Sequence, residues 1–400
     1  MTVRIIRNIA RLVMGIVFIF SGFVKDIDPL GTTYKFWDYF EAFGLGFLSH
    51  VALVLAIFLS SAELIIGVCL FLKIRLKETV WALFLFMSFF TILTFIIALT
   101  NPVADCGCFG DAILLTNWQT FFKNLIFFVP TIIVFQQRNK FEHIFKPVTQ
   151  WFVVVLIATS SVLLSVYYYY NLPLIDFRPY SIGTNIPSSM KIPEGMPIDE
   201  YKTVLDEQPW NDSTWKWIET RNVLINSGYK PPIHDFTVTS QNGVDITDTI
   251  LYDNGYSLLV VAYDLEKSSL KGFEKINEFS EKAIEHDYKV YGMTASTSEI
   301  LEEVIHSIDP VFEFYITDDI TLKTMIRSNP GLILLKEGSI IGKWHYRNIP
   351  SEEIFEDNGM AFILSALTKE RKDCIALIVV LFIGSISFLL YIFRLRKLNS

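Results

Sequence analysis

The sequence predicts an α-helical membrane protein that also carries one water-soluble α/β domain. Three observations support this class. Six apolar runs are close to the length of a membrane-spanning helix, which needs about 20 mostly apolar residues. Lysine and arginine gather in alternate connections between these runs, and one long connection, residues 171–373, is polar and acidic.

The apolar runs are residues 5–24, 51–72, 80–99, 118–135, 151–168 and 374–393. The third and sixth contain no charged residue, whereas Arg7 and Arg11 lie near the start of the first, where long side chains can reach the interface. A cleavable signal peptide is the alternative for the first run, but no small-residue cleavage site follows Val24. We expect six spans, the first four forming an antiparallel bundle with short loops.

The positive charges predict an orientation, because cytoplasmic loops carry an excess of lysine and arginine. The short loops after the first and third runs, with the residues beside them, hold only three such residues: Lys25, Lys35 and Lys123. The N-terminus and alternate connections after it hold twelve such residues: Arg4, Arg7, Arg11, Lys73, Arg75, Lys77, Arg138, Lys140, Lys146, Arg394, Arg396 and Lys397. We expect both termini to be cytoplasmic and residues 170–373 to be extracytoplasmic, in a protein of the cytoplasmic (inner) membrane.

The long soluble segment has two parts. Residues 170–228 are rich in proline, asparagine, aspartate and tryptophan, and are expected to be irregular apart from a helix near residues 213–226. Residues 229–368 are expected to alternate between strands and helices, which predicts a sheet with parallel and antiparallel members. The expected strands are residues 236–238, 256–263, 289–293 and 312–316, and the expected helices are 267–286, 299–308 and 320–327. Residues 331–335 and 339–345 are expected to form a hairpin. Residues 171–373 contain 33 acidic and 19 basic residues, a net charge of −14, so no basic surface for nucleic acid is expected.

The most informative stretch lies in the loop between the third and fourth runs: Asp105, Cys106, Gly107, Cys108, Phe109, Gly110 and Asp111. A disulfide between cysteines one residue apart closes a small constrained ring, and such strain makes the bond easier to reduce. The two glycines would relieve the backbone around it. A redox pair of Cys106 and Cys108 is one interpretation. Inert thiols or an inert disulfide is another, and a metal site is disfavoured because further cysteine or histidine ligands are lacking nearby.

Other polar residues in the apolar runs have two interpretations. Glu63 lies in the second run, where an ionisable group normally faces the bundle interior. It could relay protons or bind a quinone-like acceptor, or it could join helices through Ser21 or Ser60. Lys25 and Asp28 are expected to be interfacial anchors. Cys69 is expected to be a small apolar filler. Cys374 begins the last run at the level of the cysteine pair, so a relay from Cys374 to Cys106 or Cys108 is geometrically allowed but disfavoured.

Residues 4–135 resemble the DoxX/MauE group of small membrane proteins. The resemblance rests on DCGCFGD at residues 105–111 and on GIVFIFSGFVKDIDPLGTTYKFWDYFEAFGL near the N-terminus. It implies a four-span domain over residues 1–136, followed by a fifth span at residues 150–169. MauE-type proteins are implicated in making disulfides in exported proteins beside a thioredoxin-like partner. The resemblance therefore implies that Cys106 and Cys108 act in this chemistry, with Asp105, Gly107, Phe109, Gly110 and Asp111 as the supporting loop.

Residues 229–350 resemble thioredoxin-fold domains of the TlpA or peroxiredoxin type. The match is clearest at SNPGLILLKEG, residues 328–338, and at residues 340–344. It implies a cis peptide bond before Pro330. Active members carry Cys-x-x-Cys after the first core strand, whereas residues 263–270 read YDLEKSSL. The domain is therefore expected to dock partners rather than exchange thiols.

The sequence thus predicts a membrane protein linked to thiol–disulfide redox or to maturation of exported proteins. Its expected partners are exported thiol proteins or other envelope membrane proteins, within the lipid bilayer. A quinone is the one cofactor that the residues suggest. The alternative function is a non-catalytic scaffold subunit of an envelope complex, which the absence of Cys-x-x-Cys favours.

Overall fold

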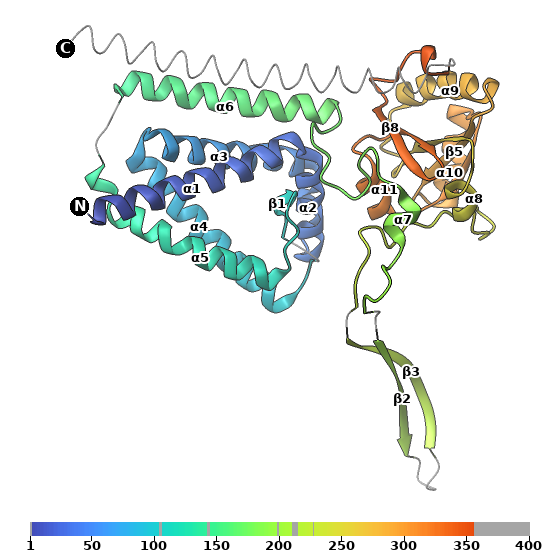
Figure 1. Cartoon of the computed structure of the whole chain (residues 1–400), viewed down its shortest axis with the longest axis horizontal. Helices are drawn as coiled ribbons and strands as arrows, with labels where there is room; N and C mark the ends of the chain where they lie inside the picture. Colours follow the sequence, from blue (N-terminus) through green and yellow to red (C-terminus); the bar gives the residue numbers. More distant parts are fainter. Residues whose placement is uncertain are drawn as a thin grey trace. The chain divides into compact units, whose positions relative to one another are not determined.

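The computed structural model describes residues 2–103, 106–141, 145–197, 200–209, 215–226 and 228–355. The described residues fall into two units, which we call the membrane unit, residues 2–178, and the sheet unit, residues 179–355 (Figure 1). The expected sixth span, residues 374–393, lies outside the described residues.

The membrane unit is helical. Its elements are α1 (Thr2–Ile27), α2 (Pro29–Ala42), η1 (Gly46–Val51), α3 (Ala52–Leu72), α4 (Leu76–Thr100), β1 (Cys108–Asp111), α5 (Asn117–Gln136), η2 (Arg138–Lys140) and α6 (Pro147–Tyr170). Within the described residues, four segments are long and apolar enough to cross a membrane: Gly46–Leu72, Leu76–Thr100, Asn117–Gln136 and Pro147–Tyr170. These correspond to the second to fifth predicted runs.

The first predicted run lies in α1, which is not among these four segments. That helix carries five charged residues, which are Arg4, Arg7, Arg11, Lys25 and Asp26. Its role as a membrane span stays a prediction.

Helix α2 was not predicted. It begins where the Asp28 side chain accepts a hydrogen bond from the backbone N–H of Gly31, with Pro29 in the first turn, where its missing N–H costs nothing.

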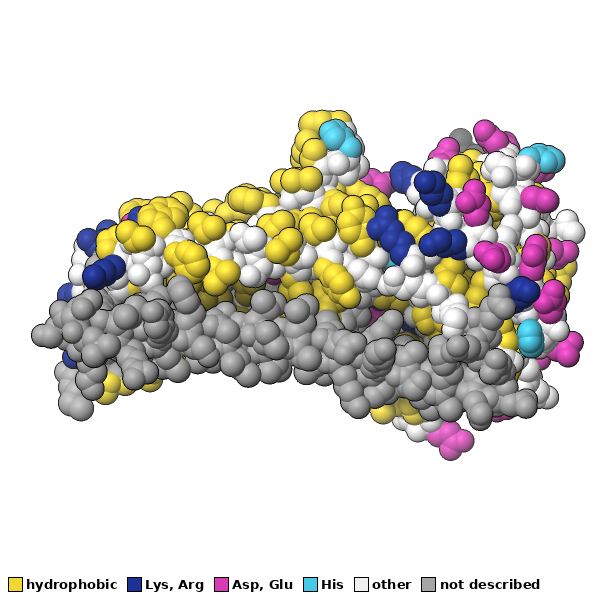
Figure 2. Space-filling view, turned by 90° about the horizontal axis from the view of Figure 1, so that it is seen from above, with side chains coloured by type: hydrophobic (Ala, Val, Ile, Leu, Met, Phe, Trp, Pro, Cys, Tyr) yellow, Lys and Arg dark blue, Asp and Glu magenta, His cyan; other side chains and the backbone are white. Residues whose placement is uncertain are grey.

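Large hydrophobic side chains cover the outside of the membrane unit, as Figure 2 shows on one face. Phe58 of α3, Phe89 of α4 and Ile126 of α5 are each at least 61% exposed. A soluble surface would not present so many large apolar side chains in one continuous area. Together with the apolar segments, this surface supports a multi-pass membrane protein.

Inside the membrane unit, α1 lies along α3, and α4 lies along α5. Met14 of α1, Leu70 of α3, Leu83 of α4 and Val134 of α5 are fully buried in one core cluster. Helix α6 is joined to α1 by polar contacts, because Ser161 and Ser165 donate hydrogen bonds to the two carboxylate oxygens of Asp26, at 2.7 and 2.8 Å. The fully buried Asp26 carboxylate is thereby satisfied.

The sheet unit contains a five-stranded mixed sheet of order β6-β5-β4-β7-β8. Strands β4 (Tyr256–Val261), β5 (Lys289–Thr294) and β6 (Glu313–Ile316) are parallel, and β7 (Gly331–Lys336) and β8 (Ser339–His345) add an antiparallel hairpin. The remaining elements are α7 (Ile186–Met190), α8 (Thr247–Leu251), α9 (Leu270–Glu285), α10 (Ser298–Ile308), α11 (Asp319–Met325) and η3 (Glu352–Phe355). The mixed sheet confirms the α/β prediction, and this region is consistent with a thioredoxin-like domain.

Two predictions in the sheet unit are wrong. The helix expected near residues 213–226 is a strand, β3 (Trp215–Asn226), which pairs antiparallel with β2 (Glu200–Pro209). Its sequence is rich in tryptophan, isoleucine, valine and threonine, which favour strands, and residues 200–209 supply the partner. Residues 236–238 form no strand, and the neighbouring Thr239 makes isolated bridges to Asp245 and to Ile316 of β6.

Candidate functional site

The two neighbouring cysteines lie in a tight turn between α4 and α5, which we call the cysteine loop, residues 106–111. The sulfurs of Cys106 and Cys108 are 2.6 Å apart. Gly107 and Gly110 have φ values of +63° and +53°, a region that favours glycine, and the Gly110 N–H donates to the Gly107 carbonyl at 3.0 Å. The turn therefore holds both thiols together. Asp105, predicted to support this loop, lies outside the described residues.

Side chains from α1 and α2 fix the position of the cysteine loop. The Ser21 hydroxyl donates to the Cys108 carbonyl at 2.8 Å, and the Lys25 ammonium donates to the same carbonyl. The Tyr39 hydroxyl donates to the Cys106 carbonyl at 3.0 Å. The backbone carbonyls of Cys106 and Cys108 thus accept hydrogen bonds from helices that are distant in sequence, and these bonds hold the cysteine loop against α1 and α2.

Glu63 and Lys25 form a buried ion pair, with 2.8 Å between Oε2 and Nζ. The two residues are 5% and 3% exposed, so the expectation that Lys25 is an interfacial anchor is wrong. The physical reason is that Glu63 on α3 faces α1 at the same level and supplies the opposite charge. Lys25 also donates to the Ser21 hydroxyl at 2.8 Å. Glu63 is therefore linked to Ser21, and to the cysteine loop, through Lys25.

Two lysines favour a thiolate at Cys108. The hydrogen bond between the two sulfurs lowers the pKa of Cys108 and raises that of Cys106, and the Lys123 and Lys25 ammonium groups lower the Cys108 pKa further. Lys123 comes from α5, and its Nζ lies 4.4 Å from the centroid of the Phe109 ring. Cys108 is accordingly the sulfur that is ionised first.

Removing the Lys123 charge is expected to move Cys108 ionisation to higher pH. The thiolate fraction rises as pH passes through the Cys108 pKa, so Lys123→Met, which raises that pKa, should shift the alkylation profile upward. The measurement is the rate of Cys108 alkylation against pH in the reduced full chain, with each cysteine quantified by peptide fragmentation. Lys77→Met, at an exposed lysine, is the control. Equal shifts in both variants would contradict a local effect of Lys123.

The cysteines line the wall of a cavity of about 250 Å³ among α1, α2, α3, α4 and α5, which we call the aromatic cavity. Its charged lining residues are Lys25, Lys35, Glu63 and Lys123. Ten of its lining residues are aromatic: Phe18, Phe36, Tyr39, Phe40, Phe43, Phe86, Phe89, Phe90, Phe109 and Phe127. Several of these side chains come from the unpredicted helix α2. The structure therefore brings the predicted residues Glu63, Cys106, Gly107, Cys108 and Phe109 to one cavity.

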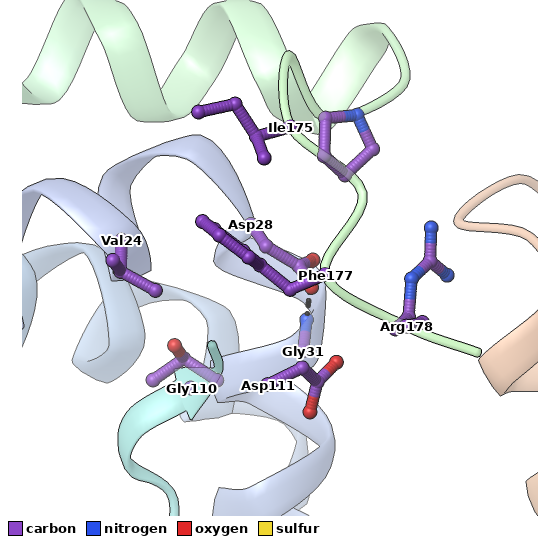
Figure 3. A pocket seen from close by; sticks show the side chains of 10 residues that line it. Val24, Asp28, Gly31, Gly110, Asp111, Ile175, Phe177 and Arg178 are labelled. Atoms are coloured by element: carbon purple, nitrogen blue, oxygen red, sulfur yellow. Dashed lines mark hydrogen bonds between the residues drawn. The ribbon is translucent and has the colours of Figure 1, made fainter. Parts of the chain in front are cut away.

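A second pocket, near the start of α2, is much smaller (Figure 3). It is bounded by Val24, Gly110, Asp111 and Phe177, and its volume is about 10 Å³. That space suits about one water molecule. Asp28 here caps α2 and so has a local structural role. Gly110 and Asp111 thus face this small pocket and are not among the residues that line the aromatic cavity.

Among the described residues, no group of three or more histidine, cysteine, aspartate or glutamate side chains could hold a metal ion. Cys69 is buried in α3 beside Ile74, Phe145 and Val153, which fits an apolar filler. Cys374 lies outside the described residues.

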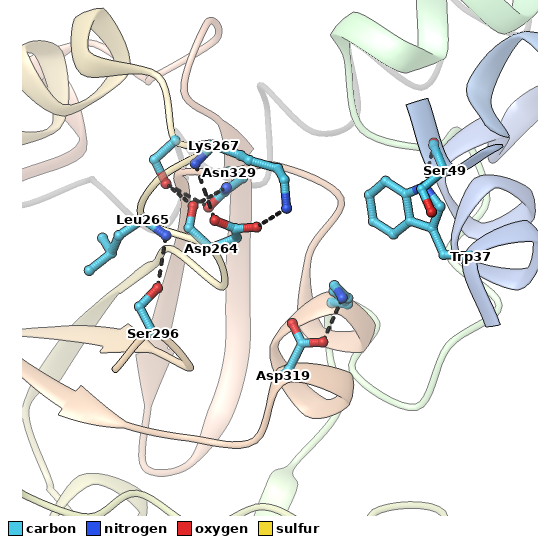
Figure 4. Close-up of polar contacts among 10 residues, drawn as sticks. Trp37, Ser49, Asp264, Leu265, Lys267, Ser296, Asp319 and Asn329 are labelled. Atoms are coloured by element: carbon cyan, nitrogen blue, oxygen red, sulfur yellow. Dashed lines mark hydrogen bonds and ion pairs between the residues drawn. The ribbon is translucent and has the colours of Figure 1, made fainter. Parts of the chain in front are cut away.

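In the sheet unit, the segment between β4 and α9 is held by hydrogen bonds to the residue before Pro330 (Figure 4). The Asn329–Pro330 peptide bond is cis. The Asn329 amide donates to the Asp264 carbonyl at 2.6 Å, and the Ser268 hydroxyl donates to the Asn329 side-chain oxygen at 2.9 Å. Ser269 caps α9 by accepting from the Gly272 N–H. Serines thus occupy the segment where the resemblance would place cysteines, and they make structural hydrogen bonds.

Sequence reasoning missed three residues of the site: the pairing role of Lys25, the loop contact of Tyr39 and the electrostatic role of Lys123. A basic residue within or beside an apolar run is the available signal, because such a charge is costly unless it is paired or reaches the interface. The sequence contains that signal for Lys25 and Lys123. It contains no comparable signal for Tyr39.

Comparison with known proteins gives one family match, and no curated protein matches the chain. The family model described as methylamine utilisation protein MauE matches residues 3–136, which end at the last residue of α5.

Two solved structures are similar to part of the chain, each with a TM-score of 0.24. One is a candidate protein disulfide isomerase from Bacteroides thetaiotaomicron, 14% identical, covering 34% of this chain and 86% of its own. The other is the peroxidoxin BcpB from Mycobacterium tuberculosis, 10% identical, covering 33% and 94%. The chain is a multi-pass membrane protein in which residues 3–136 match the MauE family model, and residues 256–345 contain a mixed five-stranded sheet.

Proposed function

We propose that this protein exchanges disulfides with exported thiol proteins, and that Cys106 and Cys108 are its redox pair. The observation that carries the proposal is the contact of the two sulfurs, 2.6 Å apart, beside the lysines that lower the Cys108 pKa. A buried, structural cysteine pair has no need of a nearby cation, whereas thiol exchange requires a thiolate.

The exchange step assigns different roles to the two sulfurs. Starting from the Cys106–Cys108 disulfide, a client thiolate attacks the Cys106 sulfur, the S–S bond breaks, and Cys108 leaves as the thiolate. The second client thiol, after losing its proton, attacks the mixed disulfide and releases Cys106, which takes up a proton. The client loses two electrons and the cysteine pair gains them. Cys108 is the better leaving group because its pKa is the lower.

The sheet unit completes the proposal as a docking module. It contains no cysteine, so it does not exchange thiols itself. Both termini would be cytoplasmic, with α1 and residues 374–393 as further spans, and the cysteine loop and residues 170–373 would share the extracytoplasmic side of the inner membrane. The distribution of lysine and arginine supports this orientation.

The test is to trap thiols in cells and identify what is bound to the loop. After brief treatment of the cells with diamide, a thiol oxidant that takes up the two electrons, Cys108→Ser should accumulate a reductant-sensitive mixed disulfide between Cys106 and a client, because the internal sulfur that reverses the reaction is gone. Cys106→Ser/Cys108→Ser should show no adduct and should alter the thiol state of exported proteins, whereas Cys69→Ser should behave as wild type. An unchanged thiol profile in the double variant, with no adduct in the single one, would rule out the proposal.

The cysteine-free sheet unit favours a second candidate, a non-catalytic scaffold for an envelope complex. Here the partner would bind independently of the loop thiols. Cross-linking and co-purification would then recover the same partner from the wild type and from Cys106→Ser/Cys108→Ser, and the variant would have no defect in thiol state.

A further inference from the structure

We propose that the aromatic cavity binds a lipid-soluble quinone, which accepts the electrons that Cys106 and Cys108 collect from clients. This inference depends on the proposed redox function, because it names the acceptor for that pair. A pair that oxidises clients stays reduced after each turnover and must pass two electrons to another molecule. The cavity lies where such an acceptor would contact the pair.

The shape and wall of the cavity fit a ring carried on an apolar tail. Its volume of about 250 Å³ is slightly below the range for pockets that hold drug-sized molecules, roughly 300–1,000 Å³, so the cavity has room for a ring while the tail lies outside it. Phe18, Phe40 and Phe90 are among the rings that line it, from three different helices. Aromatic side chains stack favourably on a flat ring. The outer surface of the same unit is apolar, so a lipid-soluble ligand can approach from the bilayer.

The charges of the cavity are concentrated at its cysteine end and favour an electron acceptor. Lys25, Lys35 and Lys123 give three positive charges and Glu63 gives one negative charge, a net charge of +2 before any thiolate forms. Negative charge develops on quinone oxygens as they are reduced, and nearby cations stabilise it in a medium of low dielectric constant. A saturated lipid tail would gain nothing from these charges.

The electron transfer balances without a further reactant. The reduced Cys106 and Cys108 lose two protons and two electrons, and an S–S bond forms between them. The quinone takes up both electrons and two protons and leaves as the hydroquinone. The pair is then the disulfide that the next client thiolate attacks.

The experiment uses the purified full chain in detergent, reduced and kept without oxygen, with short-chain ubiquinone and an azido derivative as the probes. Photolabelling followed by peptide mapping should place the label on cavity-lining segments of α2 and α4, and excess ubiquinone, but not a saturated fatty acid, should displace it. Added ubiquinone should also remove the alkylatable thiols of Cys106 and Cys108, at one quinone per pair.

Two neighbouring residues of α4 provide matched variants. Leu93 lines the cavity, whereas Ile92 is 63% exposed on the outer surface. Leu93→Trp fills the cavity and should reduce the labelling at least tenfold, and Ile92→Trp should leave it unchanged. A normal gel-filtration profile for both variants would show that the fold is retained; if Leu93→Trp does not fold, Leu59→Phe tests the same wall from α3.

The outcomes separate this inference from the redox function. Thiols that cycle in cells, together with labelling spread over lipid-facing residues or displaced equally by the fatty acid, would overturn the quinone site alone. Labelling of the cavity without any loss of the Cys106 and Cys108 thiols would overturn the acceptor role, and the redox function would then depend on the client-trapping result alone.

Discussion

Glu63→Leu is expected to destabilise the membrane unit more than any other single change at the site. The variant leaves the Lys25 ammonium 3% exposed, with the Ser21 hydroxyl and the Cys108 carbonyl as neutral acceptors. Removing one partner of a buried ion pair typically costs about 3–5 kcal/mol, because the other charge stays buried. The measurement is the temperature at which the detergent-solubilised protein loses its monodisperse peak.

The double variant Lys25→Met/Glu63→Leu separates charge from packing. Since no unpaired charge remains, most of the lost stability should return, as it does when buried pairs are replaced by apolar residues. The Cys108 carbonyl would still lack its lysine donor, so the cysteine loop should stay altered and Cys108 alkylation should shift to higher pH. Glu63→Leu as stable as the wild type would show that the pair does not support the fold.

The apolar helices and the mixed sheet could be predicted because their signals are local. The runs at residues 51–72, 80–99, 118–135 and 151–168 fall within the observed helices α3 to α6, apart from Val51, which is the last residue of η1. In the sheet unit, the prediction of residues 339–345 coincides with β8. Both kinds of element are marked by the composition of a short segment, and neither depends on knowing its neighbours.

The site could be predicted only in part, because its contacts are not local. The cysteine spacing identified Cys106 and Cys108, but the pairing of Lys25 with Glu63 joins residues 38 positions apart and depends on how α1 packs on α3. Helix α2 was missed because it is short and only weakly apolar on average. Without α2 the aromatic cavity has no wall on that side, so its existence could not be predicted either.

Gly67→Ala is expected to push α1 and α3 apart. A Cβ at Gly67 would lie 2.5 Å from the Ile19 backbone nitrogen and 2.9 Å from the Gly15 carbonyl oxygen, and backbone atoms cannot move aside as a side chain can. Small residues allow membrane helices to approach this closely. Overpacking of this kind costs about 1–3 kcal/mol, and occasionally more. Gly46→Ala, where a Cβ meets nothing within 4 Å, is the matched control.

The same substitution should also change the chemistry of the cysteine loop, because the glycine contacts and the ion pair join the same two helices. Gly67 lies one helical turn beyond Glu63 on α3, and Lys25 lies further along α1, which holds the loop through Ser21 and Lys25. Separating the helices therefore stretches the Lys25–Glu63 contact and draws Lys25 from the Cys108 carbonyl. We expect Gly67→Ala to lower thermal stability and to shift Cys108 alkylation, with both unchanged in Gly46→Ala. A stability loss with normal alkylation would mean that the loop is positioned independently of the packing of α1 on α3.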